Sequence, residues 1–287
     1  MHIVLGGTGR VGSATTRALL DLGEPVIVVT RDENRGAALK HRGAQLAIAD
    51  IRDVDGLRAV FRGGKCAFLL NPPADPSGDT DAEERATVAA IIEALSGSGL
   101  EKLVAQSTYG ARPGARCGDL TVLYEFEQRL AAQSIPAMIH RGAYYMSNWA
   151  GMLDAVRETG RLPSFFPGDL SLPMVSPDDL GLAAALRLTE PVTNTGTLHI
   201  EGPQRYTPRD VAEAFSDALK RPVQVQEIPR GELEATFRRF GFSWQAAASY
   251  ARMTRAVIDA ETETADALLR GDTSLRDYVG SIVAQAG

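Results

Sequence analysis

Three glycines spaced three residues apart follow the first apolar run of the chain. Gly6, Gly9 and Gly12 belong to the segment Gly6-Gly7-Thr8-Gly9-Arg10-Val11-Gly12, which opens a stretch with helical apolar spacing. At a strand-to-helix turn, the first glycine permits the tight turn, the second lets the backbone approach a pyrophosphate, and the third allows close packing, while the helix N-terminus supplies N–H donors. The pattern therefore predicts a dinucleotide site contacted by Gly6, Thr8, Gly9, Arg10, Val11 and Gly12. A purely structural turn is the alternative. A nucleoside-triphosphate loop is disfavoured because Ser13 rather than Lys follows Gly12.

The end of the second predicted strand bears on the choice between the two nicotinamide dinucleotides. A site for NAD usually carries Asp or Glu about 20 residues after the loop, to bind the ribose 2′-hydroxyl. Here Arg31 stands nineteen residues after Gly12, and Asp32 follows one position later. A guanidinium can make bidentate contacts with a 2′-phosphate. We therefore expect NADP(H) to be preferred over NAD(H), with Arg35 as either a second contact or a solvated helix residue.

The ends of the later strands should lie along the same ligand. In open α/β sheets, ligands bind outside the carboxyl ends of the strands. The residues expected there are Asp50, Ile51, Asn71, Pro72, Pro73, Ser107 and Thr108. Asp50 and Ile51 would contact the adenine, although Asp50 could equally cap the following helix. Ser107 and Thr108 would face the nicotinamide, and the two prolines would also stiffen a loop without any ligand.

Short apolar runs alternate with helical stretches through the first half of the chain. We predict strands at Ile3–Leu5, Val26–Thr30, Gln45–Ala49, Ala67–Leu70, Leu103–Ser107 and Ile135–Ile139. The intervening helices are predicted at Arg10–Leu22, Asn34–Arg42, Asp53–Phe61, Ala82–Leu95 and Leu120–Gln133. This alternation predicts right-handed crossovers in an α/β fold, with a doubly wound parallel sheet and helices on both faces.

After about residue 142 the pattern loosens. Helices are predicted at Asp178–Leu188 and Arg209–Leu219, short strands at Thr197–Ile200 and Val223–Ile228, and a helix-rich stretch at Gly231–Leu269. We therefore divide the chain into a dinucleotide-binding domain at 1–150 and a smaller, mostly helical substrate lobe at 151–287. No linker marks the boundary, so segments of the second half can return to the sheet.

Composition excludes several classes of partner. The 287 residues include 30 Lys and Arg against 36 Asp and Glu, a net charge of −6, which argues against nucleic acid. No apolar run is long enough to span a membrane, and the apolar start is too short for a signal peptide. Cys66 and Cys117 have no metal-binding or redox spacing. We expect a cytoplasmic protein without a metal, either a monomer or a homodimer.

Taken together, these motifs resemble the NmrA-like family of atypical short-chain dehydrogenases/reductases. The resemblance rests on the Gly6–Gly12 loop, Arg31, Asn71-Pro72-Pro73, the stretch 141–148 (RGAYYMSN) and the stretch 173–180 (PMVSPDDL). It implies a Rossmann-like domain, a small C-terminal substrate domain and a cleft between them. The family includes NAD(P)H:quinone reductases, a triphenylmethane dye reductase and NADP(H)-sensing regulators with little or no catalysis.

The proton donor of typical short-chain reductases is missing. They use Tyr-x-x-x-Lys, in which the lysine lowers the pKa of the phenol, but none of the seven tyrosines here is followed by Lys four places later. Leu123 also replaces the polar residue that many family members carry four places before Glu127. Quinone reduction needs a proton relay less than ketone reduction does, because the hydroquinone anion is stable enough to take its proton from solvent.

We therefore expect NADPH-dependent hydride transfer to a quinone-like or conjugated small molecule, or to a polycyclic aromatic compound by the same chemistry. The alternative is a non-catalytic NADP(H) sensor acting through a protein partner. Catalytic candidates are Tyr109, Tyr144 and His140, and an aromatic pocket is expected from Tyr144, Tyr145, Asn148, Trp149 and Phe165. Packing at a loop or between domains is the competing explanation for the aromatic residues, and a structural role is the competing one for His140.

Overall fold

The protein is built around one large parallel sheet. The computed structural model describes residues 1–260 and 267–286. Within them, eight strands form the main sheet in the order β13-β10-β6-β5-β4-β1-β2-β3. Every neighbouring pair is parallel. The strands are β1 (His2–Val4), β2 (Val26–Thr30), β3 (Gln45–Ile48), β4 (Cys66–Leu69), β5 (Lys102–Thr108), β6 (Ala137–Gly142), β10 (Gly196–Glu201) and β13 (Leu268–Arg270).

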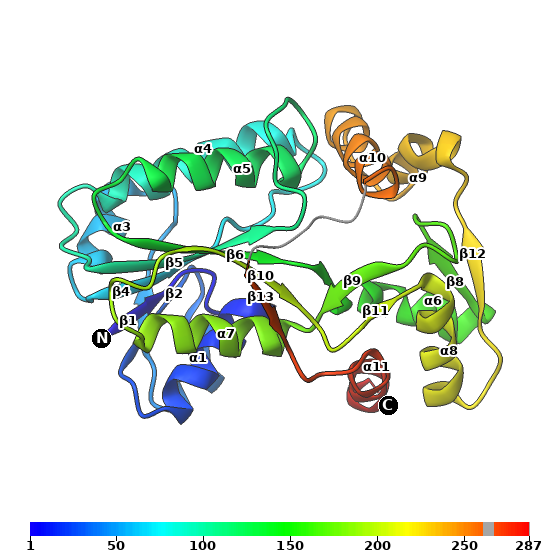
Figure 1. Ribbon diagram of the computed structural model, residues 1–287, viewed down its shortest axis with the longest axis horizontal. Helices are drawn as coiled ribbons and strands as arrows, with labels where there is room; N and C mark the ends of the chain where they lie inside the picture. Colours follow the sequence, from blue (N-terminus) through cyan, green and yellow to red (C-terminus); the bar gives the residue numbers. More distant parts are fainter. Residues whose placement is uncertain (261–266, 287) are drawn as a thin grey trace.

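Helices cover both faces of this sheet (Figure 1). One face carries α3 (Val54–Phe61), α4 (Thr80–Leu95) and α5 (Asp119–Ala131), and the other carries α1 (Arg10–Asp21), α2 (Glu33–His41) and α7 (Pro177–Thr189). Each layer buries a separate apolar core against the strands, as the hydrophobic effect requires of a sheet with two apolar faces. Helices α1 and α7 pack closely against each other, since a Cβ on Gly181 would lie 2.4 Å from that of Ala14.

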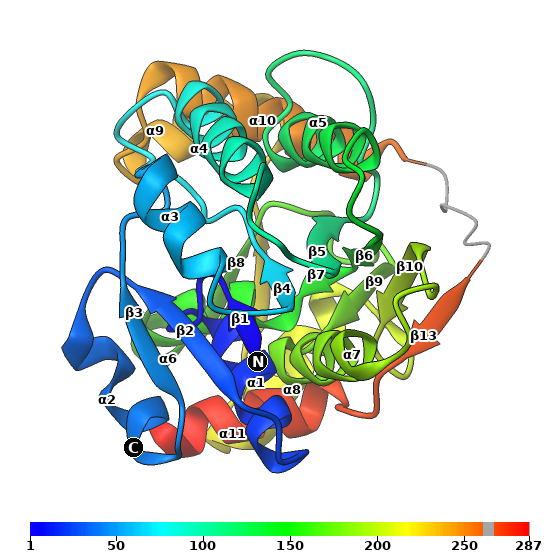
Figure 2. The same cartoon turned by 90° about the vertical axis from the view of Figure 1, so that its left-hand side faces the viewer.

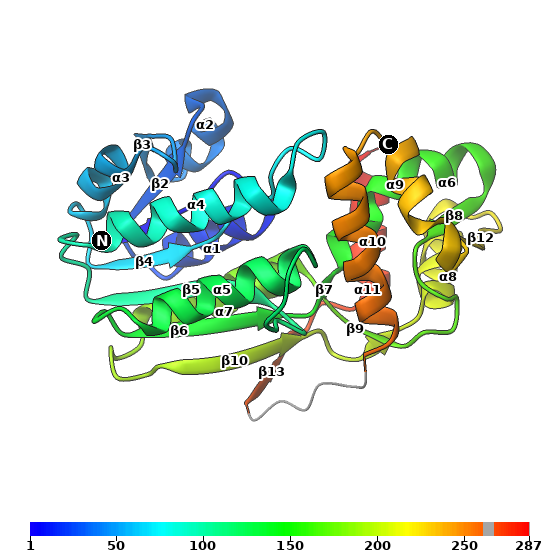
Figure 3. The same ribbon diagram turned by 90° about the horizontal axis from the view of Figure 1, so that it is seen from above.

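A second lobe stands beyond the carboxyl ends of the strands (Figure 3). It has its own apolar core and two small sheets, of order β11-β9-β7 and β12-β8. Its strands are β7 (Tyr144–Tyr145), β8 (Arg161–Ser164), β9 (Leu172–Val175), β11 (Arg205–Tyr206) and β12 (Gln224–Glu227). Its helices are η1 (Met146–Met152), α6 (Leu153–Thr159), α8 (Pro208–Leu219), η2 (Arg230–Glu232), α9 (Leu233–Arg239), α10 (Trp244–Ile258) and α11 (Leu275–Gln285).

Local capping signals set where several helices start. Asp32, Asp53, Asp79, Ser176 and Thr207 each accept a backbone N–H from the first turn of the helix that follows. Such a side chain satisfies one of the N–H groups that a helix N-terminus leaves without a partner.

The predicted α/β fold with a doubly wound parallel sheet is confirmed. The sixth strand begins at Ala137 rather than Ile135, because Pro136 has no N–H to donate to the ladder. Beyond residue 150, strands β10 and β13 belong to the main sheet and α7 belongs to its helical layer. Leu268 and Leu269, at the end of the predicted helix-rich stretch, belong to the strand β13 rather than to a helix, and residues 261–266 of that stretch lie outside the described residues.

Helix α10 of the second lobe packs back over the loops that follow β4 and β5 (Figure 2). The N–H of Ser243 donates to the carbonyl of Pro76 at 2.8 Å, and its hydroxyl donates to the carbonyl of Gly78 at 2.6 Å. The N–H of Gly118 donates to the Ser249 hydroxyl at 2.9 Å. The second lobe therefore holds two loops at the edge of the sheet where ligands bind. In the part of the chain that the structure describes, none of the helices is long and apolar enough to cross a membrane.

Candidate functional site

A cleft of about 1070 Å³ opens at the carboxyl ends of β1 to β4. One wall is formed by the glycine loop, the segments after β2, β3 and β4, and Glu83 and Thr87 of α4. The start of the second lobe closes one end. Its lining includes Gly6, Thr8, Gly9, Arg10, Val11, Gly12, Arg31, Asp50, Ile51, Pro72, Pro73, Tyr145 and Asn148, all named from the sequence. Residues from the start of the chain and from the second lobe therefore share one cavity.

The glycine loop has the geometry of a backbone cradle. Gly6 has a φ of +61°, and the N–H of Gly9 donates to its carbonyl at 2.8 Å. A Cβ on Gly12 would lie 2.2 Å from that same carbonyl oxygen, so only glycine fits. No side chain in the described residues caps the N-terminus of α1. The first N–H groups of the helix are therefore available to an anionic ligand, with the helix dipole favouring negative charge.

Beyond β2, the acidic and basic residues have different roles. Asp32 is the N-cap of α2, and its carboxylate accepts the N–H of Asn34 at 2.9 Å. Its backbone carbonyl accepts the hydroxyl of Thr30 at 3.1 Å. Arg31 and Arg35, both exposed, line the cleft beside it. The carboxylate that could bind a ribose hydroxyl is used as a helix cap, while two guanidinium groups border the cavity.

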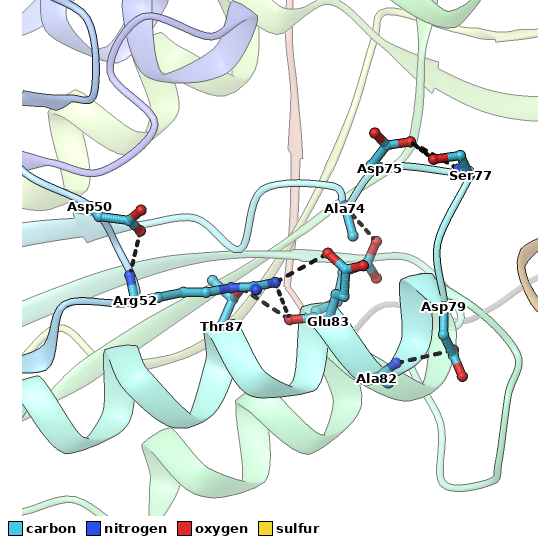
Figure 4. A network of polar contacts seen from close by, with 10 residues as sticks. Asp50, Arg52, Ala74, Asp75, Ser77, Asp79, Ala82, Glu83 and Thr87 are labelled. Atoms are coloured by element: carbon cyan, nitrogen blue, oxygen red, sulfur yellow. Dashed lines mark hydrogen bonds and ion pairs between the residues drawn. The ribbon is translucent and has the colours of Figure 1, made fainter.

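A polar network closes the far end of the nucleotide wall (Figure 4). The Arg52 guanidinium donates to the hydroxyl of Thr87 at 3.2 Å and to the carbonyl of Glu83 at 3.1 Å, which joins the loop after β3 to α4. The Asp50 carboxylate accepts the N–H of Arg52 at 2.9 Å. Asp50 is not the cap of α3; that position belongs to Asp53, because only Asp53 lies directly before the first turn. Arg52 was missed from the sequence because its partners lie 31 and 35 residues away.

The loop after β4 is held by a buried glutamate of α4. The N–H of Ala74 donates to the Glu84 carboxyl at 3.1 Å, and Ala74 lines the cleft. Glu84 is 2% exposed, and burial together with the nearby carboxylates of Asp119 and Asp81 raises its pKa to about 8. Asn71, expected at the cofactor, is not among the cleft residues; its amide oxygen is buried and has no hydrogen-bond partner among the described residues.

The end of β5 turns away from the cleft. Ser107 is 1% exposed, and its hydroxyl donates to Glu127 of α5, which also pairs with Arg141 at 2.8 Å. The Tyr109 hydroxyl donates to Glu201 at 3.0 Å. Neither residue lines the cavity, nor does Thr108. These three residues therefore lie outside the cavity lining, and the polar partners of Ser107 and Tyr109 belong to other parts of the fold.

His140 is not positioned to act as an acid in the cleft. Its side chain is fully buried, and neither ring nitrogen has a hydrogen-bond partner among the described residues. Burial and the charge of Arg187 lower its pKa to about 3. The imidazole is therefore neutral at physiological pH and lacks the second proton that an imidazolium would donate as an acid.

Only part of the expected aromatic pocket faces the cavity. Tyr144 packs edge-on against Trp149 and Phe166, with ring centroids 5.8 and 5.2 Å apart, inside the core of the second lobe. Phe165 stacks on Phe237 at 4.4 Å in a separate cluster with α9 and α10. Consecutive residues of a strand face opposite sides, so Tyr145 points the other way from Tyr144. Of the five residues expected there, Tyr145 and Asn148 line the cleft.

Burial and the charge of Asp119 raise the pKa of the Tyr145 phenol well above its ordinary value. Tyr145 therefore keeps its proton at neutral pH and can donate a hydrogen bond.

The Asp75 carboxylate accepts both the N–H and the hydroxyl of Ser77, which lowers its pKa. No group of His, Cys, Asp and Glu in the described residues could hold a metal ion.

The model of the NmrA-like family matches residues 2–264 of the chain. The NAD(P)H azoreductase of Xenophilus azovorans is 27% identical over 229 residues, which covers 79% of this chain and 77% of that protein. The triphenylmethane reductase of Citrobacter sp. complexed with NADP(H) has a similar fold, with a TM-score of 0.79 at 20% identity over 100% of this chain and 99% of that one. The NADPH-dependent quinone oxidoreductase of Escherichia coli complexed with NADPH gives a TM-score of 0.75 at 19% identity over 98% and 99%.

Proposed function

The chain belongs to the NmrA-like family, and on this premise we propose that it is an NADPH-dependent reductase that transfers hydride to a quinone-like or other conjugated small molecule. The observation that supports this most is the single cleft that contains both the glycine loop and the start of the second lobe. One end suits the phosphates of a dinucleotide, and the other offers Tyr145 and Asn148 to a second molecule.

The cofactor proposal rests on fit at two places. The loop around Gly12 leaves no room for a side chain, and the uncapped N-terminus of α1 offers N–H groups to a pyrophosphate. Arg31 and Arg35 border the cavity where a 2′-phosphate would lie, and Asp32 is engaged as a helix cap. This division favours NADP(H) over NAD(H).

In the proposed reaction, the residues of the chain position the two ligands and do not supply the hydride. NADPH supplies the hydride when it is bound. The glycine loop positions the dinucleotide, and Tyr145 and Asn148 orient the acceptor by hydrogen bonds from the phenol and the amide. The Asp75 carboxylate, whose pKa is lowered, is no proton donor at neutral pH. An acceptor whose anion is stabilised by conjugation suits such a site best.

The experiment that tests this follows NADPH oxidation through the absorption of the reduced nicotinamide. The panel contains a benzoquinone, a naphthoquinone, an azo dye and a cationic triarylmethane dye, and is repeated with NADH. We expect oxidation that depends on the acceptor and is faster with NADPH. Failure to bind either nucleotide would contradict the cofactor assignment.

A second function is favoured by the missing Tyr-x-x-x-Lys pair. A non-catalytic NADP(H) sensor would use the same nucleotide wall and act through a protein partner. It predicts saturable NADPH binding without oxidation across the whole panel, together with different affinities for NADP⁺ and NADPH. The same experiment therefore separates the two functions.

A further inference from the structure

Arg10 occupies an electrostatically unfavourable position. It is the first residue of α1, where the helix dipole favours negative charge, and no acidic residue stands in the first turn to offset its guanidinium. The side chain lines the cleft next to the backbone cradle. The helix dipole does not favour the positive charge of Arg10 at this position. The contacts that Arg10 makes outside its own helix are therefore the ones to consider.

Those contacts cross to the second lobe. Nη1 of Arg10 donates to the carbonyl oxygen of Ser147 at 2.7 Å, across 137 residues of chain. Ser147 is 5% exposed and belongs to η1. Burial raises the pKa of the Tyr278 phenol, on α11, and the neighbouring Arg10 and Ser147 act against that rise, so the phenol lies beside both residues. The guanidinium therefore meets elements from the beginning, the middle and the end of the described chain.

The segment that Arg10 contacts is the acceptor wall of the cleft. Tyr145, Ser147, Asn148 and Gly151 all line the cavity, within seven consecutive residues, 145–151. Arg10 thus stands between the place where a pyrophosphate would bind and the backbone that carries Tyr145 and Asn148. A hydrogen bond from a charged donor is stronger than a neutral one, and a nearby phosphate would hold the guanidinium in place.

We infer that Arg10 is a positioning residue that couples dinucleotide binding to the order of the acceptor wall, residues 145–151. The inference rests on the proposed function for the identity of the two ligands. When the phosphates bind, the guanidinium is held between a phosphate and the carbonyl of Ser147. Residues 145–151 then become ordered in the conformation that binds the acceptor. By linkage, an acceptor that binds the ordered wall tightens the dinucleotide by the same factor.

The first test uses hydrogen exchange with NADP⁺ as the probe, so that it needs no turnover. In the wild-type protein, NADP⁺ should slow amide exchange in both the glycine loop and 145–151. In Arg10→Met, protection should remain in the glycine loop and be lost from 145–151. Arg17→Met is the matched control, because Arg17 lies on the same helix and pairs with Asp178 at 2.6 Å on the surface.

Equal protection of 145–151 in the wild type and in Arg10→Met would overturn the inference, as would its absence from the wild type when NADP⁺ is bound. If NADP⁺ fails to bind the wild type at all, the proposed function falls, and the inference with it. The two failures are therefore distinguishable.

The second test is kinetic. Arg10→Met should raise the acceptor KM by about tenfold, the usual size of such coupling, with a smaller change in the Kd for NADPH. Arg10→Lys should recover part of the loss, because an ammonium can still donate to the Ser147 carbonyl. A KM for acceptor that stays at the wild-type value in Arg10→Met would overturn the coupling role.

Discussion

The nucleotide end of the cleft and its acceptor end are assembled differently. At the nucleotide end, most lining residues follow directly after consecutive strands, and the glycine loop makes its turn by contacts within seven residues, 6–12. The loop after β4 and the acceptor end depend instead on distant contacts. Glu84 of α4 and Ser243, the N-cap of α10, hold the loop around Ala74, and Arg10 holds the backbone of Ser147 at the acceptor end. The comparison teaches that one part of a binding cleft can be encoded locally while other parts of it depend on contacts between distant segments.

The largest expected effect comes from a substitution in the glycine loop, at the nucleotide end of the cleft. Gly12→Ala would place a Cβ 2.2 Å from the carbonyl oxygen of Gly6, which forces the loop to move. We expect NADPH affinity to fall by about 3 kcal/mol, the upper end of the usual cost of overpacking. Isothermal titration with NADPH measures this, and thermal unfolding shows whether the fold survives. Wild-type affinity in Gly12→Ala would contradict the cradle.

A second prediction concerns the buried carboxyl of Glu84, which holds the loop after β4. The pKa of Glu84 is about 8 in the folded protein, above its ordinary 4.5, so the folded state binds more protons than the unfolded state between these values. Its contribution to stability is therefore present below about pH 4.5 and is lost as the pH rises through about 8.

Glu84→Gln removes this titration and keeps an acceptor for the N–H of Ala74. Between pH 5 and pH 8 the free energy of unfolding should fall more in the wild type than in the variant, by on the order of 3 kcal/mol. Urea unfolding at the two pH values measures the difference. Glu93→Gln, on the exposed side of α4, is the matched control. Parallel pH profiles for the wild type and Glu84→Gln would contradict the raised pKa.

The smallest expected effect concerns Arg31, at the nucleotide end of the cleft. Arg31→Ala should weaken NADPH binding by about 1.5–3 kcal/mol, the scale of a charge-assisted hydrogen bond, and leave NADH binding nearly unchanged. Titrations with both nucleotides measure the two affinities. Equal losses for NADPH and NADH would remove Arg31 from the 2′-phosphate site, and Asp32 would then need to be tested as a ribose contact.

The expectations from the sequence succeed or fail along the same division. The glycine spacing, the strands near it and the parallel sheet depend on local patterns with one good physical solution, and the fold class is confirmed by the structure. Ser107, His140 and Tyr144 were expected at the site, but they point into polar or apolar packing instead. A strand-end position determines where a residue lies and leaves open which face its side chain takes and which distant partner holds it.

By itself, the sequence determined the βαβ pattern, the glycine loop and the presence of Arg31 after the second strand, because each depends on residues close together in the chain. Only the tertiary structure decided that Arg52 reaches α4, that Glu84 lies buried behind Ala74, and that Arg10 binds Ser147. These contacts join residues 10 to 137 positions apart. Contacts between residues so far apart in the sequence depend on how the helical layers and the two lobes pack together. Local residue spacing does not specify that packing.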